Sequence, residues 1–187
     1  MTKLLDETRR GFLGLGLSAL ACSLTATPAL AKWARPISTG AKSLAFHNLH
    51  TDEKLRVTYW RDGSYDRNAW GQINYILRDH YSGDQHPMDL RLMDLLHDVQ
   101  SRLQSDQTIE IISGYRSPAT NLHLREASGG VAKNSFHMRG MAIDVRMDGV
   151  TLPHLHNTAL ALGRGGVGYY PDSQFVHMDV GPVRRWG

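Results

Sequence analysis

A carboxylate inside an apolar, strand-like run is the feature that most constrains this chain. Residues 140–147 read GMAIDVRM, with Asp144 in the second half of the run. Because alternate residues of a strand face the same side, Ile143 and Val145 share an apolar face while Asp144 points to the other side. An ionised carboxylate in such surroundings is costly unless it is paired with a cation or bound to a metal ion. The sequence therefore predicts a strand here whose second face holds something that neutralises Asp144.

A second run with the same alternation follows further along the chain. Residues 175–180 read FVHMDV, so the polar residues His177 and Asp179 share one face of the expected strand. His177 lies 33 residues after Asp144. If the two strands are neighbours in a sheet, Asp144 and His177 converge on one point.

A third candidate ligand, His137, precedes the first strand in the sequence SFHMRG. The small residues Gly140 and Ala142 leave room for His137 to approach Asp144. Two histidines, one carboxylate and an open position for water make the ligand set of a catalytic zinc site. Zinc lowers the pKa of its bound water toward about 7 and polarises a carbonyl group, which is the chemistry of amide hydrolysis.

Each of these residues also has a simpler interpretation when it is taken alone. The chain has ten histidines, so a hydrogen-bonded structural role is the ordinary expectation for any one of them. For Asp144 the simpler role is a buried ion pair with an arginine. The combined spacing of His137, Asp144 and His177 nevertheless favours the zinc site.

The first 31 residues have the features of an export signal. Arg9 and Arg10 precede an apolar stretch at 12–24, and Pro28-Ala29-Leu30-Ala31 is a small-x-small cleavage site. Paired arginines before Gly-Phe-Leu are typical of the bacterial twin-arginine signal. The alternative is a retained anchor, but the apolar stretch is shorter than the roughly 20 residues that span a bilayer. We therefore expect a cleaved signal peptide, a periplasmic protein of a Gram-negative bacterium, and no stable membrane insertion after cleavage.

Charge and cysteine content limit the partners of the mature chain. The leader contains three of the 21 Lys and Arg and two of the 18 Asp and Glu, which leaves 18 against 16, a net charge of +2. That charge is too small to indicate nucleic acid as a partner, and it is compatible with an anionic cell-wall polymer. The one cysteine, Cys22, lies in the leader. Any zinc ligands must therefore be histidines and carboxylates.

The remaining sequence predicts a linker at 32–43 and one α+β domain at 44–187, with a small antiparallel sheet that carries the zinc site and helices packed on one side. The expected elements are a hairpin at 43–49 and 54–60, helices at 66–81, 88–103, 118–126 and 152–163, a strand at 108–115, and two strands within 165–180 that a turn at 171–172 joins.

The motif SxHxxGxAxD, at residues 135–144, resembles the signature of zinc D-Ala-D-Ala peptidases. That group also includes the dipeptidases of vancomycin resistance and the metal-binding fold of hedgehog signalling domains. The likeness extends from about Ser43 to Trp186, and it is most similar to the MepK/YcbK-type murein endopeptidases. The segments that carry it are NLHT (48–51), ISGYRS (112–117), GVAK (130–133), GGVGYYP (165–171), FVHMDVGP (175–182) and the twin-arginine leader.

This resemblance implies a hedgehog/D-Ala-D-Ala peptidase-like fold and zinc-dependent hydrolysis of peptide cross-links in peptidoglycan. Both D-Ala–diaminopimelate and diaminopimelate–diaminopimelate links are implied targets. The resemblance also implies that Arg116 steadies the substrate carbonyl or its oxyanion, a role that suits a fixed guanidinium. The alternative for Arg116 is an ion pair with a nearby acid that braces its loop.

The general base is where this sequence departs from the family that it resembles. Members of that family often have an acid three residues before the last histidine, or a histidine two residues before it. Gln174 and Phe175 occupy these places, and neither accepts a proton. Asp179, on the same face as His177, is the nearest candidate for a catalytic acid or base; alternatively it orients the His177 ring as a hydrogen-bond acceptor. Both roles stay open at this point.

Two other functions remain alternatives to an endopeptidase. One is a D-Ala-D-Ala carboxypeptidase, which trims a terminal residue instead of a cross-link. The other is a non-catalytic peptidoglycan-binding module of the same fold, which the replacement of the usual acid by Gln174 favours. The preferred cross-link, the regulation and the oligomeric state do not follow from the sequence.

Overall fold

The computed structural model describes residues 40–128 and 130–187. The predicted signal peptide at 1–31 and the linker residues 32–39 lie outside the described residues. Within the described ranges, no helix combines the length and the apolar character that crossing a membrane requires.

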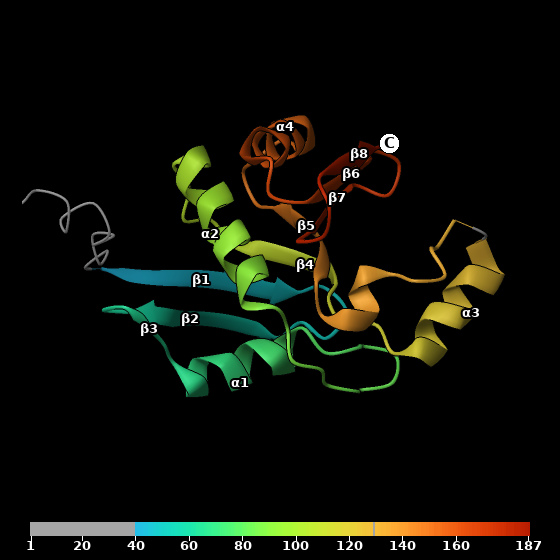
Figure 1. Cartoon of the computed structure of the whole chain (residues 1–187), viewed down its shortest axis with the longest axis horizontal. Helices are drawn as coiled ribbons and strands as arrows, with labels where there is room; N and C mark the ends of the chain where they lie inside the picture. The colour runs from blue at the N-terminus through green and yellow to red at the C-terminus, as the bar shows by residue number, and fades with distance from the viewer. Residues whose placement is uncertain (1–39, 129) are drawn as a thin grey trace, which may run out of the picture. The chain divides into compact units, whose positions relative to one another are not determined.

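The described residues form one eight-stranded sheet with the strand order β3-β2-β1-β4-β5-β7-β6-β8 (Figure 1). Two neighbouring pairs are parallel, β1 with β4 and β6 with β8, and the other pairs are antiparallel. The strands are β1 (Ala41–Asn48), β2 (Lys54–Arg61), β3 (Ser64–Tyr65), β4 (Ile109–Ser113), β5 (Ala142–Met147), β6 (Gly166–Tyr170), β7 (Phe175–Asp179) and β8 (Arg184–Trp186).

Four α-helices and one 3-10 turn accompany the sheet: α1 (Arg67–Ile76), α2 (Leu90–Leu103), α3 (Pro118–Ser128), η1 (Phe136–Arg139) and α4 (Leu152–Leu162). Aspartates start two of the helices, because Asp66 accepts the free N–H groups of Asn68 and Ala69, and Asp89 accepts that of Arg91.

Apolar side chains from the sheet and the helices meet in one core. Helices α2 and α4 contact each other, and α4 packs on β5, β6 and β7. Ile143, Val145, Val176 and Met178 lie in this core, so the apolar faces expected of β5 and β7 are the ones that are buried. The polar face of these two strands is therefore left for the site.

The α+β class expected from the sequence is confirmed, and the sheet is antiparallel from β4 through β5 and β7 to β6. The sheet is wider than expected, because the parallel pairs extend it on both sides. Strand β1 begins at Ala41, so residues 41–43 of the expected linker pair in the sheet. The expected helix at 66–81 ends at Ile76, because the side chain of Asp79 accepts the N–H groups of Tyr81 and Ser82 and forms a turn there.

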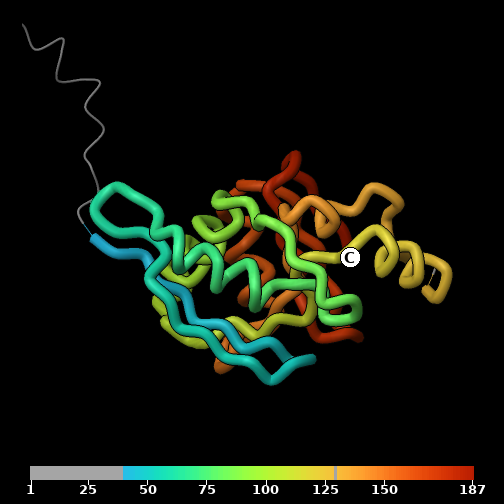
Figure 2. Tube along the Cα trace, turned by 90° about the horizontal axis from the view of Figure 1, so that it is seen from below, coloured from blue at the N-terminus to red at the C-terminus, as the bar shows by residue number. Residues whose placement is uncertain are grey.

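Helix α3 differs from the other helices in its position. It projects from the edge of the domain beyond η1, in both views (Figure 1, Figure 2). Only Thr120 and Asn121 are buried in it. Helix α3 begins directly after the loop that contains Arg116. This loop connects the helix to the polar face of the sheet.

Candidate metal centre

The register of the sheet brings the polar residues of three strands into one row. Asp144 of β5 lies directly opposite His177 of β7, and Ser113 of β4 lies opposite Asp144. Residues opposite each other in a ladder project to the same face. Strands β5 and β7 are neighbours, which is the condition under which the sequence expects Asp144 and His177 to converge.

His137 reaches the same point from η1, the short turn that precedes β5. Ser135 caps the start of this turn by accepting the N–H of His137, and Gly140 ends it with a φ of 62°. A Cβ atom on Gly140 would lie 2.4 Å from the carbonyl oxygen of Pro87, so only glycine fits there. The turn thereby holds the imidazole of His137 over β5.

Three potential ligand atoms meet at this point. Nε2 of His137 lies 3.2 Å from Oδ1 of Asp144 and 3.2 Å from Nδ1 of His177, and the last two atoms are 2.8 Å apart. A tetrahedral ion with bonds of about 2.0 Å holds its ligands roughly 3.3 Å apart, close to these separations. His137 and Asp144 are buried, whereas 11% of the His177 side chain is exposed.

The outer nitrogens of both rings fix which atoms face inward. Nδ1 of His137 lies 2.7 Å from the carbonyl oxygen of Gly114, and Nε2 of His177 lies 3.0 Å from Oδ2 of Asp179. These oxygens accept hydrogen bonds, so the outer nitrogens donate. In neutral rings the inner nitrogens then have free lone pairs that face the carboxylate of Asp144. Three acceptors aimed at one point fit a divalent cation, and two histidines with one aspartate are a zinc-type ligand set.

The acid–base properties of Asp144 and His137 agree with this arrangement, whereas those of His177 favour its protonated form. Burial opposes ionisation of Asp144, but the adjacent His137 and His177 hold its pKa far below the usual range. Burial lowers the pKa of His137, and the nearby Arg116 adds to this effect. Burial also acts to lower the pKa of His177, but hydrogen bonds to Asp144 and Asp179 outweigh burial and raise it. A neutral His137 beside an ionised Asp144 is the state that a metal ion requires.

Arg116 lies beside the cluster. Its Nε donates to Oγ of Ser113 at 2.8 Å, and its Nη2 donates to Oδ2 of Asp144. Its loop is fixed by the N–H of Tyr115, which donates to the carbonyl oxygen of Leu77 at 2.8 Å. The guanidinium is thus held next to the candidate ligand atoms by its own side chain and by its backbone.

Asp179 lies behind His177, on the side away from Asp144. The side chain is fully buried, and besides His177 it accepts hydrogen bonds from the N–H groups of Gly166 and Gly181 and from Arg184. Burial acts to raise its pKa, but these donors lower it well below the usual range. Of the two roles left open by the sequence, this position fits the one in which Asp179 orients the His177 ring.

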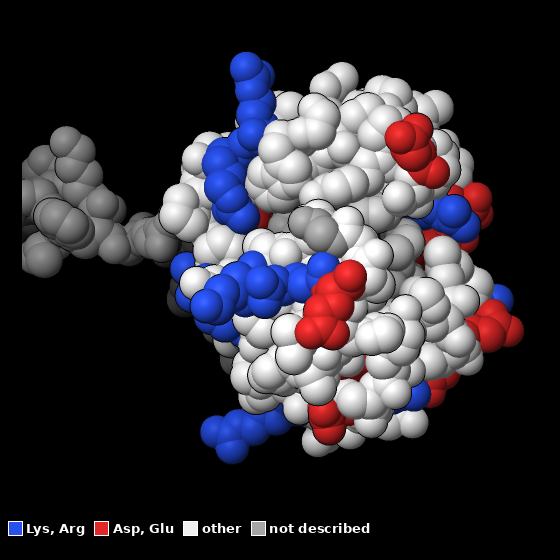
Figure 3. All heavy atoms as spheres, turned by 90° about the vertical axis from the view of Figure 1, so that its right-hand side faces the viewer, with Lys and Arg blue, Asp and Glu red and all other residues white. Residues whose placement is uncertain are grey.

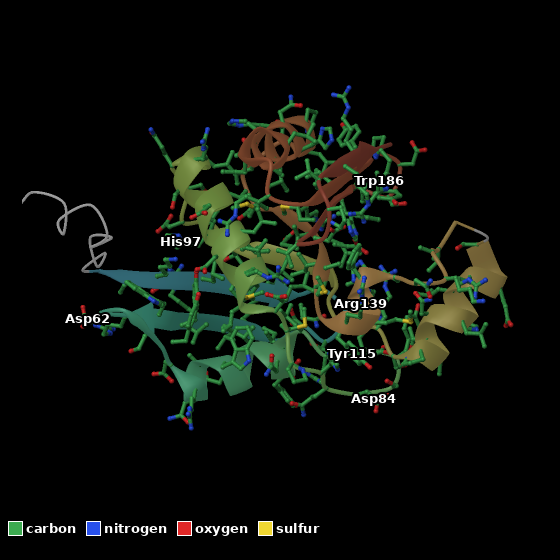
Figure 4. All side chains as sticks on the ribbon, viewed as in Figure 1. Asp62, Asp84, His97, Tyr115, Arg139 and Trp186 are labelled. Carbon is green, nitrogen blue, oxygen red and sulfur yellow. The ribbon has the colours of Figure 1, made fainter. Side chains whose placement is uncertain are left out.

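A cavity of about 580 Å³ opens over the cluster, and Arg116 and the three candidate ligands line it. Residues of the loop at 130–135 line it as well, and so do four aromatic side chains, those of Phe136, Tyr170, Phe175 and Trp186. Trp186 lies on the β8 side of this region and Arg139 on the η1 side (Figure 4). On the face that includes α3 and β8, side chains of both charges are spread among uncharged residues (Figure 3).

The sequence model of the peptidoglycan L,D-endopeptidase MepK family matches residues 37–186. This chain belongs to the MepK family. The peptidoglycan L,D-endopeptidase MepK of Escherichia coli strain K12 is 38% identical over 181 residues, which cover 97% of this chain and 98% of that protein. The probable peptidoglycan L,D-endopeptidase MepK of Haemophilus influenzae is 38% identical over 182 residues, which cover 97% of this chain and 96% of the relative. No solved structure matches this chain.

Membership of the MepK family confirms the resemblance read from the sequence motifs, including the hedgehog/D-Ala-D-Ala peptidase-like fold. The MepK family consists of metal-dependent peptidases. Within residues 40–128 and 130–187, the cluster of His137, Asp144 and His177 is the group of side chains that fits a metal ion.

In this MepK-family chain Gln174 lies in the turn between β6 and β7, and Phe175 is the first residue of β7. Gln174 is exposed, and its side-chain amide donates to the carbonyl oxygen of Pro171. Phe175 stacks on Tyr170 with the ring centroids 4.5 Å apart. Among the described residues that line the cavity, Asp144 is the one carboxylate. Neither residue can act as a general base, because an amide and a phenyl ring do not accept a proton.

Several residues of the site were not identified from the sequence. The carbonyl of Gly114, which holds His137, depends on a contact 23 residues away in the chain. Arg184 and Trp186 lie on β8, which is too short to predict from alternation. The sequence signal for Arg184 and Trp186 is the pair Gly166 and Gly168, because glycines inside a strand often mark the close approach of another group.

Proposed function

We propose that this chain is a zinc-dependent murein endopeptidase that hydrolyses peptide cross-links of peptidoglycan. The observation that carries the proposal is the convergence of Nε2 of His137, Oδ1 of Asp144 and Nδ1 of His177 at the base of a cavity, in a chain of the MepK family. The relative from Escherichia coli is named a peptidoglycan L,D-endopeptidase. A bond between an L-centre and a D-centre is found in diaminopimelate–diaminopimelate links, so we propose these as the preferred substrate, with D-Ala–diaminopimelate links as the alternative.

In this proposal His137, Asp144 and His177 hold the ion, which when bound supplies a Lewis acid and lowers the pKa of a coordinated water toward about 7. Arg116 directs its guanidinium at the scissile carbonyl and stabilises the negative charge that develops on its oxygen. Ser113 and Asp144 hold that guanidinium in place before the substrate arrives. Asp179 fixes the orientation of His177 instead of exchanging protons with substrate.

We also propose export to the periplasm. The first supporting observation is the pair Arg9 and Arg10 before an apolar stretch within residues 1–31. The second is that both relatives are named as peptidoglycan endopeptidases, one of them as a probable one. Peptidoglycan lies outside the cytoplasmic membrane, so an enzyme with this substrate has to leave the cytoplasm.

The test uses the purified chain without its predicted leader, incubated with cross-linked sacculi. The expected result is conversion of diaminopimelate-linked muropeptide dimers to monomers, arrested by a chelator and restored by Zn²⁺. His137→Ala is expected to be inactive. Equal activity of His137→Ala, with no effect of chelator, contradicts the proposal.

The products also separate the two alternatives. Release of free D-alanine without loss of dimers indicates the carboxypeptidase. Sedimentation with sacculi and an unchanged muropeptide profile indicate the binding module, for which the absence of an acid at Gln174 is the favouring feature.

A further inference from the structure

The last strand of the chain reaches the metal-binding face of the sheet. Strand β8 lies at the sheet edge, parallel to β6, with Arg184 beside Gly166 and Trp186 beside Gly168. Neighbouring residues of paired strands share a face, so Arg184 and Trp186 project to the face that carries His177. Arg185, between them, projects to the opposite face and is exposed.

Two glycines of β6 make this approach possible. A Cβ atom on Gly166 would lie 2.3 Å from Nη1 of Arg184 and 2.5 Å from Oδ2 of Asp179. A Cβ atom on Gly168 would lie 2.6 Å from the ring of Trp186. Any larger residue at either place would collide with these groups. Because Gly166 and Gly168 have no side chains, the side chains of β8 extend across β6 and contact residues of β7.

Arg184 uses this path to bind Asp179 with both terminal nitrogens. Nη1 lies 3.0 Å from Oδ1 and Nη2 lies 2.7 Å from Oδ2. Such a two-point guanidinium–carboxylate contact fixes the plane of the carboxylate as well as its position. The same Oδ2 accepts the hydrogen bond from Nε2 of His177 at 3.0 Å. A chain of direct contacts thus runs from β8 through Asp179 to the outer nitrogen of a candidate metal ligand.

Trp186 adds a second contact to the same ring. Its ring centroid lies 5.2 Å from that of His177, and its Nε1 donates to the hydroxyl of Tyr170 at 2.8 Å. The guanidinium of Arg184 lies 4.8 Å from the Trp186 ring. The three side chains of Arg184, Trp186 and Tyr170 hold one another in place beside His177.

We propose that β8 is part of the metal site, with Arg184 as a positioning residue that sets the affinity for the metal ion through Asp179 and His177. This inference rests on the metal-binding part of the proposed function. A carboxylate that accepts the outer N–H of a ligand histidine fixes the tautomer and the ring orientation, and loss of such a partner typically costs about 10- to 100-fold in metal affinity. Arg184 pairs with the buried Asp179 and holds it aligned for that task. Without it, a buried charge loses its paired cation.

The test measures Zn²⁺ affinity by competition with a chelator of known strength, in the full chain without its leader. Arg184→Gln is expected to bind Zn²⁺ about 10- to 100-fold more weakly than the wild type. Arg185→Gln, one residue further along β8 and on the other face, is the matched control and is expected to bind like the wild type. With Co²⁺ in place of Zn²⁺, the absorption bands are expected to change in Arg184→Gln and not in Arg185→Gln, because they report the ligand geometry.

A double-mutant cycle separates positioning from a general effect on folding. If Arg184 acts through Asp179, Arg184→Gln has little further effect on Zn²⁺ affinity in a chain that already carries Asp179→Asn. Additive losses, or an Arg184→Gln chain with wild-type affinity and an unchanged Co²⁺ spectrum, overturn the inference. A wild-type chain that binds Zn²⁺ tightly yet leaves all muropeptide dimers intact contradicts the endopeptidase function and leaves this inference standing.

Discussion

Arg116 contacts a candidate metal ligand and also lines the cavity. Its Nε and Nη2 are occupied by Ser113 and Asp144, whereas Nη1 has no hydrogen-bond partner among residues 40–128 and 130–187. Arg116 lines the cavity, and we expect its free Nη1 to donate to the substrate carbonyl there. A lysine at this position keeps the charge but has no fork, so it cannot hold both partners and still face the substrate.

We therefore expect Arg116→Lys to retain metal and lose turnover. Removal of one oxyanion donor typically lowers kcat by about 10²- to 10³-fold, and the same range is expected here. The measurement is the rate of dimer cleavage at saturating substrate, together with the zinc content of the variant. Wild-type kcat in Arg116→Lys, or a variant that is inactive because it lacks zinc, would assign Arg116 to bracing the site instead.

Asp79 is a second residue whose effect can be measured separately. It is buried and accepts the N–H groups of Tyr81 and Ser117, the residue that follows Arg116. Burial opposes its ionisation, but hydrogen bonds from Thr120, Ser117 and Tyr81 prevail and lower its pKa to about 2. Since the pKa is about 3.9 in an unfolded chain, the ionised side chain stabilises the fold above that pH, and this contribution is lost as the pH falls toward 2.

A difference of nearly two pKa units corresponds to about 2.5 kcal/mol. Asp79→Asn is expected to lose about that much of the free energy of unfolding at pH 7 and to show a shallower decline between pH 4 and pH 2. Urea unfolding at a series of pH values measures both effects. Asp84→Asn is the control, because the Asp84 side chain is exposed and bonds only to Ser82 in the described part of the chain. Parallel pH profiles for wild type and Asp79→Asn would show that Asp79 has no such role.

At the scale of elements, the loop from β4 to α3 holds one of the candidate ligands through its backbone. The carbonyl of Gly114 accepts the N–H of His137 Nδ1, and the loop packs directly on the residues that follow α1. A Cβ atom on Gly114 would lie 2.4 Å from the carbonyl oxygen of Leu77, a backbone atom that cannot rotate away. The position of this loop therefore depends on a glycine.

We expect Gly114→Ala to move the loop and to lower both the stability and the affinity for Zn²⁺. The matched control is Gly71→Ala in α1, where nothing lies within 4 Å of the new atom. There alanine is expected to stabilise the helix by about 1 kcal/mol, because glycine is a poor helix former. Thermal unfolding and zinc competition of the two variants make the comparison. Unchanged metal affinity in the Gly114→Ala variant would mean that the Gly114 carbonyl is not needed to hold His137.

The elements of the site differ in how far the sequence predicts them. Strands β5 and β7 are predictable because their alternation places Asp144 and His177 opposite the apolar residues, and burial of those residues fixes which face is which. The contacts of Gly114 and Arg184 are not predictable in the same way. They depend on which distant segments pack side by side, and on the direction of side chains within a three-residue strand. The sequence alone does not distinguish the two roles of Asp179, because a residue on the same face as His177 can be either a proton carrier or a hydrogen-bond acceptor that orients the ring.

At the scale of the whole domain, the candidate ligands connect separate parts of the chain. His137 comes from η1, Asp144 from β5 and His177 from β7, and helix α4 packs on the opposite face of β5 and β7. An ion bound by all three residues links segments that are 40 residues apart in sequence. Because the unfolded chain does not present these ligands together, the binding free energy adds to the stability of the fold.

Removal of the metal is therefore expected to lower the unfolding temperature of the whole domain. Zinc at a free concentration of about 1,000 times its Kd stabilises the fold by about 4 kcal/mol. For a chain of this size each kcal/mol corresponds to roughly 2–4 °C, so a chelator should lower Tm by about 10 °C. In His123→Ala, which alters an exposed histidine of α3 outside the cluster, the same shift is expected. In His137→Ala the Tm should already be low and should not respond to chelator. If chelator lowers the Tm of His137→Ala as much as that of the wild type, the stabilising ion is bound elsewhere and not by His137, Asp144 and His177.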